Sequence, residues 1–559
     1  MGKLNWAMRA YALFLLCVAT AIALPAQTFA APQSGSVTPV VPNETIALPA
    51  AQTFETLHSF DGTDGTELSS GLVQGTDGNF YGTTAYGGAN NNTTVCSGGC
   101  GTVFKITPGG TLTTLYSFCS QSTCTDGIRP YAGLVQATDG NFYGTTVSGG
   151  AGAGTVFKIT PGGTLTTLHS FNGTDGGNPY AGLVQAADGN LYGTTYGGGA
   201  SGDGTVFKIT PSGTLTTLHS FDNTDGGLPE AALVQGTDGD FYGTTGSGGA
   251  NAAGCGGYGC GTVFKITPSG TLTTLYSFNY DGAGSANPLA PLVQATDGNF
   301  YGTTEFGSGP DNMCMGEGCG TVFKITPGGT LTTLHFFCSQ GGSDCTDGSY
   351  PYAGLVQGTD GDLYGTTYAG GTLVTPAMGI CNNGHWNDEG CGTVFKITPS
   401  GTLTTLYNFC PLSTCSHGQF PIGGLVQATN GDFYGTTFLG GANLCAGYLW
   451  LGCGTVFSLS VGLGPFVETQ PTSGWVGELV KILGTSLTGA TRVTFNGHRA
   501  AFRVVSSSLI TTTAPAGATT GAVEVVTPSG TLSSNVPFRV VPCPLCFSPM
   551  GPGGEGGDD

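Results

Sequence analysis

The cysteines are the most regular residues in this 559-residue chain that could do chemistry. Of the 19 cysteines, all but Cys17 fall into pairs whose members lie close together in the sequence. In a chain that is exported, such short-range pairs predict disulfides. A four-cysteine metal site would need two pairs to converge, and most pairs have no second pair or histidine nearby in the sequence, so no metal ligands are predicted. The predicted disulfides join Cys96 to Cys100, Cys119 to Cys124, Cys255 to Cys260, Cys314 to Cys319, Cys338 to Cys345, Cys381 to Cys391, Cys410 to Cys415, Cys445 to Cys453 and Cys543 to Cys546.

Aromatic residues between the predicted strands could do a second kind of chemistry, which is stacking on the faces of sugar rings. They predict binding of an extracellular glycan or a protein rather than a reaction. The candidate binding residues are Tyr86, Tyr131, Tyr180, Tyr258, Phe306, Tyr352, Trp386 and Trp450.

Catalytic patterns are scarce in this sequence. It contains no Gly-x-Ser-x-Gly, no His-Glu-x-x-His and no phosphate-binding loop, so no catalytic residue is predicted. A glycan-cleaving hydrolase or lyase would need two carboxylates that converge at one mouth of a channel. Asp388 and Glu389 are the adjacent acidic pair to test for that alternative.

Repeated histidines and acids do not predict a cofactor. His58, His169 and His219 occupy a position where other copies of the same segment carry Tyr116 or Tyr276, which indicates a packing position for a planar, partly polar ring. The acids that follow, as in residues 61–65, resemble calcium loops in their closely spaced oxygens, but the EF-hand spacing with its distal Glu is absent. No cofactor is predicted, and calcium is kept as the alternative.

A repeated block of four short segments must position all these residues. Each copy opens with Leu-Val-Gln, continues through a polar turn to Tyr-Gly-Thr-Thr, and reaches Gly-Thr-Val-Phe and then a Leu-Thr-Thr-Leu segment. These runs of Val, Thr, Tyr, Phe and Leu, separated by Asp-Gly or Gly-Gly turns, predict four strands, a to d, and one propeller blade per copy. The seven copies of strand a begin at Leu72, Leu134, Leu183, Leu233, Leu292, Leu355 and Leu425.

The phase of the repeats predicts a closed ring. The last copy ends at residues 454–459 with no strand d after it, and an orphan strand of type d, residues 53–60, precedes the first strand a. Pairing between these two segments would leave neither terminal blade with a long unpaired edge. The sequence therefore predicts an all-β fold, a seven-bladed β-propeller over residues 53–463.

The two faces of such a propeller differ in sequence. The b–c and d–a loops open on one face, called the loop face here, and the a–b and c–d turns open on the other, called the turn face. The turns have nearly the same sequence in every copy. The b–c loops vary in length, from residues 147–153 to residues 368–391. All cysteines of the repeats lie in loops of the loop face. Variable loops on a rigid scaffold predict that function belongs to the loop face.

The repeats, with Gly-Leu-Val-Gln, Asp-Gly-Asn-Phe-Tyr-Gly-Thr-Thr and Gly-Thr-Val-Phe-Lys-Ile-Thr-Pro, resemble the GloVer-type tandem repeats of bacterial exported proteins. That resemblance implies a repeat architecture at the cell exterior and no defined activity. Residues 464–541 break the period, and their Gly474-Trp475-Val476-Gly477 and Val523-Glu524-Val525-Val526 runs resemble an IPT/TIG domain, a small immunoglobulin-like sandwich. Such domains are spacers or protein contacts.

The N-terminus predicts export. Residues 1–30 have the charged, apolar and small-residue order of a secretory signal peptide, followed by a linker over residues 31–52, and residues 542–559 read as a disordered tail. No later segment is long and apolar enough to span a membrane. A net charge of -20 disfavours nucleic acid as a partner, and 101 Gly, 30 Pro and 9% charged residues exclude a helical bundle. The sequence thus predicts a secreted or cell-surface binding scaffold, with a glycan-cleaving hydrolase or lyase as the alternative.

Overall fold

The structure is a computed structural model that describes residues 52–542, except 92–94, 252–254, 256–257, 280–284, 308–313, 315–317, 341–344, 373–380, 382–389, 411–414, 444 and 446–451. The predicted signal peptide, most of the linker and nearly all of the predicted tail lie outside the described residues. Within the described part of the chain, no helix has the length and apolar character needed to cross a membrane.

The first repeat forms a sheet of four antiparallel strands, β2 (Val73–Gln74), β3 (Phe80–Thr84), β4 (Thr102–Ile106) and β5 (Leu112–Ser117). Strand β3 is buried along its whole length and β4 exposes Lys105 in part, whereas every residue of β5 is half-buried or exposed. The glycine before β4 is required, because Gly101 has φ of 95° and a Cβ there would lie 2.4 Å from the carbonyl oxygen of Thr84.

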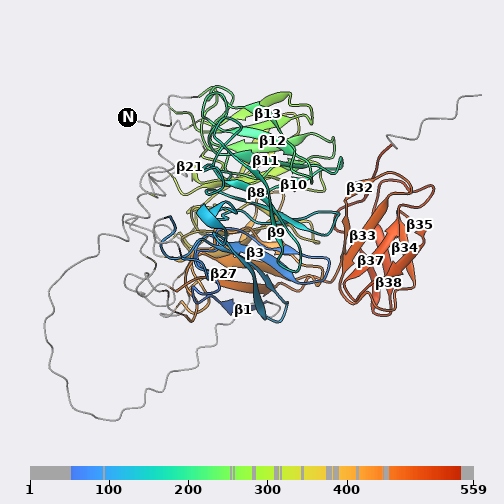
Figure 1. Ribbon diagram of the computed structural model, residues 1–559. Coiled ribbons are helices and arrows are strands. Elements are labelled where there is room, and N and C mark those ends of the chain that lie inside the picture. The colour runs from blue at the N-terminus through green and yellow to red at the C-terminus, as the bar shows by residue number, and fades with distance from the viewer. Residues whose placement is uncertain are drawn as a thin grey trace, which may run out of the picture.

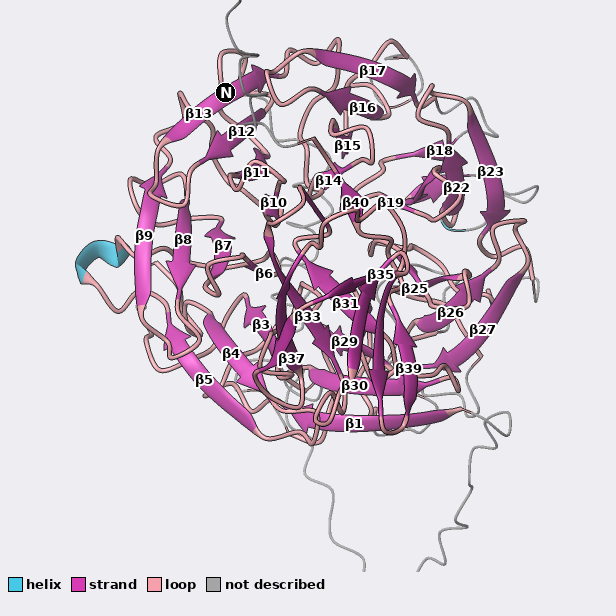
Figure 2. Ribbon diagram, turned by 90° about the vertical axis from the view of Figure 1, so that its right-hand side faces the viewer, coloured by secondary structure: helices cyan, strands magenta, loops and turns pink. Residues whose placement is uncertain are grey.

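The same sheet recurs around a ring in the described residues (Figure 2), and the all-β prediction is confirmed. The further sheets are β6 (Val135–Gln136), β7 (Phe142–Thr146), β8 (Thr155–Ile159) and β9 (Leu165–Ser170); β10 (Val184–Gln185), β11 (Leu191–Thr195), β12 (Thr205–Ile209) and β13 (Leu215–Ser220); β14 (Val234–Gln235), β15 (Phe241–Thr245), β16 (Thr262–Ile266) and β17 (Leu272–Ser277); β19 (Val293–Gln294), β20 (Phe300–Thr304), β22 (Thr321–Ile325) and β23 (Leu331–Phe336); β24 (Val356–Gln357), β25 (Leu363–Thr367), β26 (Thr393–Ile397) and β27 (Leu403–Asn408); and β28 (Val426–Gln427), β29 (Phe433–Thr437), β30 (Thr455–Ser460) and β1 (Thr53–Ser59). Blades 1 to 7 are numbered here in this order.

Two short elements lie in the loops of the loop face. Strand β18 (Ser285–Ala286) pairs with β21 (Phe306–Gly307), and η1 (Ser122–Cys124) is a single 3-10 turn.

The ring closes through the N-terminal strand, as the repeat phase predicted. Strand β1 pairs antiparallel with β30, from Thr53 opposite Ser460 to Ser59 opposite Thr455. Phe54 of β1 stacks on Tyr407 of blade 6, with ring centroids 3.8 Å apart. The first strand of the described residues therefore completes the last blade and joins it to its neighbour.

A glutamine in every strand a links the blades to one another, which the sequence reading did not foresee. The backbone N–H that follows strand a of one blade donates to the side-chain oxygen of this glutamine in the next blade, as Thr76 does to Gln136 at 2.8 Å. The last blade makes the same contact with the first, from Thr429 to Gln74 at 3.0 Å. The contacts in between are Thr138 to Gln185, Ala187 to Gln235, Thr237 to Gln294, Thr296 to Gln357 and Thr359 to Gln427.

The C-terminal domain is a sandwich of two four-stranded sheets. Its core contains Val480, Ile482, Phe495, Val525 and Phe538. One sheet holds β31 (Val467–Gln470), β33 (Leu479–Gly484), β37 (Leu509–Thr513) and β36 (Phe502–Val504), the other holds β35 (His498–Ala500), β34 (Arg492–Phe495), β38 (Val523–Thr527) and β39 (Gly530–Ser533), and β32 (Ser473–Gly474) pairs with β40 (Arg539–Val540).

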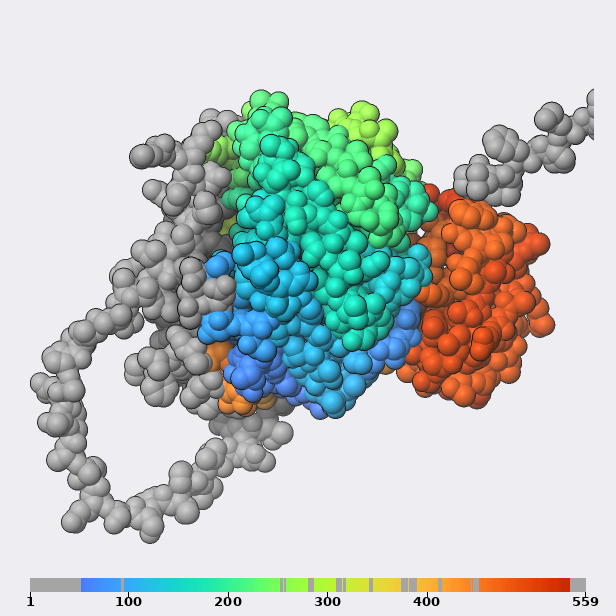
Figure 3. Space-filling view, viewed as in Figure 1, coloured from blue at the N-terminus to red at the C-terminus, as the bar shows by residue number. Residues whose placement is uncertain are grey.

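This sandwich lies against the turn face of the ring (Figures 1 and 3). Lys481 donates to the carbonyl oxygen of Thr138 at 2.7 Å, and Asn535 donates to that of Gln357 at 3.2 Å. These acceptors belong to blades 2 and 6, so the domain spans the ring across its axis. Further hydrogen bonds join Gln470 to Gln136, Ser508 to Thr76, Thr429 to Thr485 and Phe466 to Thr429.

Candidate binding site on the loop face

Each d–a loop ends with a residue in the left-handed conformation, directly before the segment that enters strand a. For a residue other than glycine this conformation is uncommon. Arg129 shows what holds it there, because its N–H donates to the carbonyl of Cys100 and its carbonyl accepts from the N–H of Val147. The residues at this position, with φ between 53° and 59°, are Glu67, Arg129, Asn178, Leu228, Asn287, Tyr350 and Phe420.

The two backbone hydrogen bonds fix the direction of the residues that follow, at the loop-face end of the innermost strands. Two positions per blade lie there. The first, two residues after the left-handed residue, holds Ser69, Tyr131, Tyr180, Glu230, Leu289, Tyr352 and Ile422. The second, directly after strand b, holds Ala85, Val147, Tyr196, Gly246, Glu305, Tyr368 and Phe438.

Tyrosines from three consecutive blades form a continuous contact, called the tyrosine arc here: Tyr86, Tyr131, Tyr180 and Tyr196. The hydroxyl groups of Tyr131 and Tyr86 are 3.4 Å apart, the rings of Tyr131 and Tyr180 are 5.5 Å apart, and those of Tyr180 and Tyr196 are 5.4 Å apart. The guanidinium of Arg129 lies 4.9 Å from the ring centre of Tyr86, a cation–π contact. Aromatic faces, hydroxyl groups and one cation therefore alternate along this arc.

Two carboxyl groups continue the ring of side chains beyond the tyrosine arc, and Glu230 and Glu305 are called the carboxyl pair here. Tyr352 donates its hydroxyl to Glu305 at 2.8 Å, and the amide of Asn287 lies 3.5 Å from the other oxygen of that carboxyl. The ring of Tyr352 packs edge-on against Tyr368 at 5.4 Å. Blade 7 completes the circle with the apolar side chains of Ile422 and Phe438.

Burial changes the protonation of these groups. Burial, and secondarily the neighbouring carboxyl of Glu305, raises the pKa of Glu230 to about 8. Burial and the carboxyl of Glu230 raise the pKa of Tyr180 to about 12, and burial together with Glu305 raises the pKa of Tyr352 well above its ordinary value. Near neutral pH, Glu230 is thus mostly protonated and can donate a hydrogen bond while Tyr180 and Tyr352 stay neutral.

The structure brings together only part of the predicted aromatic set. Tyr86, Tyr131, Tyr180 and Tyr352 lie in the circle just described, and Phe306 packs behind it against Tyr350, with ring centroids 6.2 Å apart. Tyr258 is 45% exposed in a b–c loop and makes no ring contact with the other described residues. Trp386 and Trp450, and the acidic pair Asp388 and Glu389, lie outside the described residues.

Sequence reasoning missed Glu230, Glu305, Arg129, Tyr196 and Tyr368. An available signal was the comparison of blades at one position: the residue after the proline is Tyr in Pro179-Tyr180 but Glu in Pro229-Glu230. A charged residue in place of a ring at a packed position marks a site where chemistry differs between blades.

The acids of the d–a loops serve the loops themselves. Asp61 accepts hydrogen bonds from the N–H of Thr63 at 2.8 Å and from its hydroxyl at 2.7 Å, and Asp64 lies 2.7 Å from Nε2 of His58. The ring of His58 in turn packs edge-on against Phe60. Equivalent pairs are His169 with Asp175, His219 with Asp225, and His335 with Asp347.

The cysteines of the loop face are joined as local pairs. Disulfides link the partners of eight predicted pairs, from Cys96–Cys100 to Cys445–Cys453. Cys543 and Cys546 lie outside the described residues.

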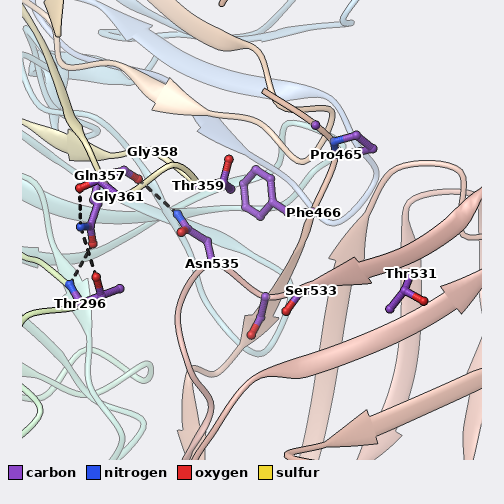
Figure 4. A pocket seen from close by; sticks show the side chains of 12 residues that line it. Thr296, Gln357, Gly358, Thr359, Gly361, Pro465, Phe466, Thr531, Ser533 and Asn535 are labelled. Atoms are coloured by element: carbon purple, nitrogen blue, oxygen red, sulfur yellow. Dashed lines mark hydrogen bonds between the residues drawn. The ribbon is translucent and has the colours of Figure 1, made fainter. Parts of the chain in front are cut away.

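A cleft of about 410 Å³ lies at the opposite end of the molecule, between the ring and the C-terminal domain (Figure 4). Asn535 and Phe466 reach it from the C-terminal side, and Gln357 and Thr296 reach it from blades 6 and 5. Its lining contains no ionisable side chain. The cleft therefore offers packing and neutral hydrogen bonds between the two domains.

Comparisons with known proteins found a domain profile and solved structures to which parts of the chain are similar. The IPT/TIG domain profile matches residues 467–540. Among solved structures, a fungal alcohol oxidase of the AA5 family in complex with copper is 13% identical, covering 87% of this chain and 98% of its own, with a TM-score of 0.48. The periplasmic gluconolactonase of Pseudomonas aeruginosa is 16% identical, covering 65% and 93%, with a TM-score of 0.37. No curated protein sequence matches the chain.

The profile of the Gloeobacter/Verrucomicrobia repeat matches three overlapping stretches, residues 45–151, 93–255 and 253–375, which together exceed half of the chain. These stretches include the repeats that build the ring from its closing strand through blade 5. The chain belongs to the Gloeobacter/Verrucomicrobia repeat family and carries a C-terminal IPT/TIG domain.

Proposed function

We propose that the chain is an exported, non-enzymatic binding protein that holds a neutral glycan at the loop-face end of the ring axis. The tyrosine arc provides faces on which sugar rings stack, and Glu230, Arg129 and the tyrosine hydroxyl groups bind the sugar hydroxyl groups. The IPT/TIG domain serves as a spacer on the turn face.

The continuous contact of Tyr86, Tyr131, Tyr180 and Tyr196 carries this proposal. A sugar ring presents an apolar face of C–H groups and an edge of hydroxyl groups, so it suits a surface that combines aromatic faces with hydrogen-bonding groups. Glu230 in its protonated form both donates and accepts hydrogen bonds without a net charge. The overall net charge of -20 disfavours an anionic glycan.

The test is binding of neutral oligosaccharides from an array, followed by calorimetry on the best ligand. Replacing both Tyr131 and Tyr180 by Ala should weaken binding at least about tenfold, which corresponds to about 1.4 kcal/mol. The matched control is Tyr258→Ala, because Tyr258 belongs to the same face but lies outside the circle of contacts. Equal affinity of the double variant and the control would overturn the proposal.

Export is part of the same proposal. The disulfides of the loops fit an oxidising compartment. Expression of the full chain in a bacterium, followed by mass spectrometry of the exported form, should give an N-terminus near residue 31. Retention of residues 1–30 in a chain that stays in the cytoplasm would contradict export.

The carboxyl pair favours a second candidate function, glycan cleavage. Glu230 is mostly protonated near neutral pH and is close enough to the carboxyl of Glu305 for that carboxyl to raise its pKa further, and a glycosidase needs one such group to donate a proton to the glycosidic oxygen and a second carboxyl to assist. In that case Glu230→Gln would abolish turnover of a bound glycan and leave its affinity within about threefold of the parent. A bound glycan that the parent protein leaves intact would exclude cleavage and leave the binding proposal standing.

A further inference from the structure

Cysteine pairs that are separate in the sequence meet in two blades. In blade 5 the b–c loop brings Cys314 and Cys319 to the d–a loop cysteines Cys338 and Cys345, and the four sulfur atoms all lie within 4.8 Å of one another. In blade 6 the corresponding quartet lies equally close. Its members are Cys381, Cys391, Cys410 and Cys415.

The four sulfur atoms of each quartet lie close enough to surround one metal ion once the disulfides are reduced. Four thiolates at the usual Zn–S distance of about 2.3 Å lie about 3.8 Å from one another. Sulfurs of different pairs already lie within 4.8 Å of one another, and the two sulfurs of each disulfide, which are bonded in the structure, separate when that bond is reduced. Seven of the eight cysteines are buried, and Cys338 is partly buried. A closed set of four sulfur ligands is the donor set of structural zinc sites, and thiolates select zinc over the hard cations calcium and magnesium.

The disulfides present in the structure crosslink each loop only to itself. Cys314–Cys319 and Cys338–Cys345 each close a loop within a sequence separation of 5 or 7 residues, so neither one connects the b–c loop to the d–a loop. A zinc ion bound by the same four sulfurs would connect both loops. The crosslink would span from residue 314 to residue 345 and would fasten strand d of the blade to its inner strands.

We propose that in the reduced chain each of these two quartets binds one Zn²⁺ through four thiolates. Each disulfide takes up two electrons from a phosphine, which becomes the phosphine oxide, and two protons from water, which also supplies the oxygen of the oxide, so each quartet gains four thiols. Binding of Zn²⁺ then releases the four thiol protons. When an added disulfide oxidant accepts four electrons and is itself reduced to thiols, the four thiolates become two disulfides and release the metal, so oxidised and metal-bound forms exclude each other.

Other blades provide an internal control. Cys255 and Cys260 in blade 4 lie in the same kind of b–c loop, but the described part of the following d–a loop contains no cysteine. Two thiolates alone make a poor zinc site. Blade 1 is intermediate, with Cys96, Cys100 and Cys119 within 4.8 Å of one another.

The experiment measures zinc in the full chain reduced with a phosphine, loaded with Zn²⁺ and freed of excess metal. Replacing Cys314 and Cys338 by Ser should lower the zinc content by one per chain, and additional replacement of Cys381 and Cys410 should lower it by two. Cys255→Ser with Cys260→Ser should leave it unchanged. A reduced parent protein that binds no more zinc than the variant with all four cysteines replaced would overturn the proposal.

A second measurement needs no variant and so avoids any folding defect. In the reduced parent protein, Zn²⁺ should protect eight thiols of the two quartets from alkylation, and a chelator should expose them again. Peptide mapping assigns the protected thiols. Equal alkylation of Cys314, Cys345, Cys391 and Cys415 with and without Zn²⁺ would contradict the proposal.

Discussion

The turn face and the loop face of the ring are built from the same strands but have opposite characters. On the turn face each blade repeats one hairpin, in which Asp77 accepts hydrogen bonds from Asn79 and from the hydroxyl of Tyr81, and the Gln136 type of contact repeats in every blade. On the loop face, equivalent positions hold Tyr180, Glu230 or Leu289. Because uniform contacts on the turn face hold the blades in place, residues on the loop face can differ from blade to blade.

Both faces depend on the closed ring, so a change that opens the ring should have the largest effect. Phe54→Ala removes a ring that stacks on Tyr407 and packs against Phe457 and Phe409. We expect a loss of about 3 kcal/mol in the free energy of unfolding, measured by chemical denaturation. The exposed neighbour in the same strand is the control, and Glu55→Ala should change stability by less than about 0.5 kcal/mol. Equal effects of the two changes would mean that β1 does not carry the closure.

The second prediction is that Glu230 on the loop face makes the stability of the fold depend on pH. The folded chain holds a proton on Glu230 up to about pH 8, whereas the unfolded chain releases it near 4.5, so this residue makes the fold less stable as pH rises through that window. A shift from 4.5 to about 8 corresponds to about 5 kcal/mol when unscreened, and solvent screens part of it because Glu230 is only partly buried, so Glu230→Gln should raise stability at pH 9 by about 1–2 kcal/mol relative to the parent and leave it unchanged at pH 4. Thermal unfolding across pH 4–9 measures it. A constant difference at all pH values would be inconsistent with a raised pKa.

The third prediction concerns the turn face, where no such pH dependence is expected. Gln235→Ala removes a hydrogen bond from Ala187 and another to the carbonyl of Gly239. We expect a loss of about 1 kcal/mol in the free energy of unfolding, the same at pH 5 and pH 8. If the loss in the free energy of unfolding changed with pH as it does for Glu230, the turn face and the loop face would not differ in the way described here.

The smallest effect is expected where the IPT/TIG domain meets the turn face. Lys481→Ala removes one hydrogen bond, to the carbonyl of Thr138, among several that join the domain to the ring. Ring stability should change by less than about 0.5 kcal/mol, and backbone amide signals of residues 137–140 should shift. Arg499→Ala, on the strand β35 of the sheet that does not contain Lys481, is the control and should leave those signals in place.

Much of the ring could be predicted because its signal is repeated. The phase shift between the orphan strand and the truncated last copy is enough to predict that residues 53–60 pair with residues 454–459, and β1 and β30 do pair. The all-β class and the C-terminal sandwich also follow from patterns that span whole segments. Repetition averages out the ambiguity of any single short strand.

The site was less predictable, because it depends on which side chains converge. Tyr131 and Tyr180 were found as loop aromatics, but Glu230 looks in the sequence like an ordinary exposed acid beside a turn. Its burial follows from the neighbouring blades, which no local pattern encodes. The same holds for the cysteine quartets, because pairs such as Cys314–Cys319 and Cys338–Cys345 meet only through the folding of a whole blade.

The docking of the IPT/TIG domain between Lys481 with Thr138 and Asn535 with Gln357 has a further consequence for any long polymer. The domain contacts blades 2 and 6 on the turn face, so a polymer running along the ring axis from the loop face would meet it on the other side. If the loop face binds a glycan as proposed, we expect it to bind chain ends or short segments, and short oligosaccharides should compete fully with long chains.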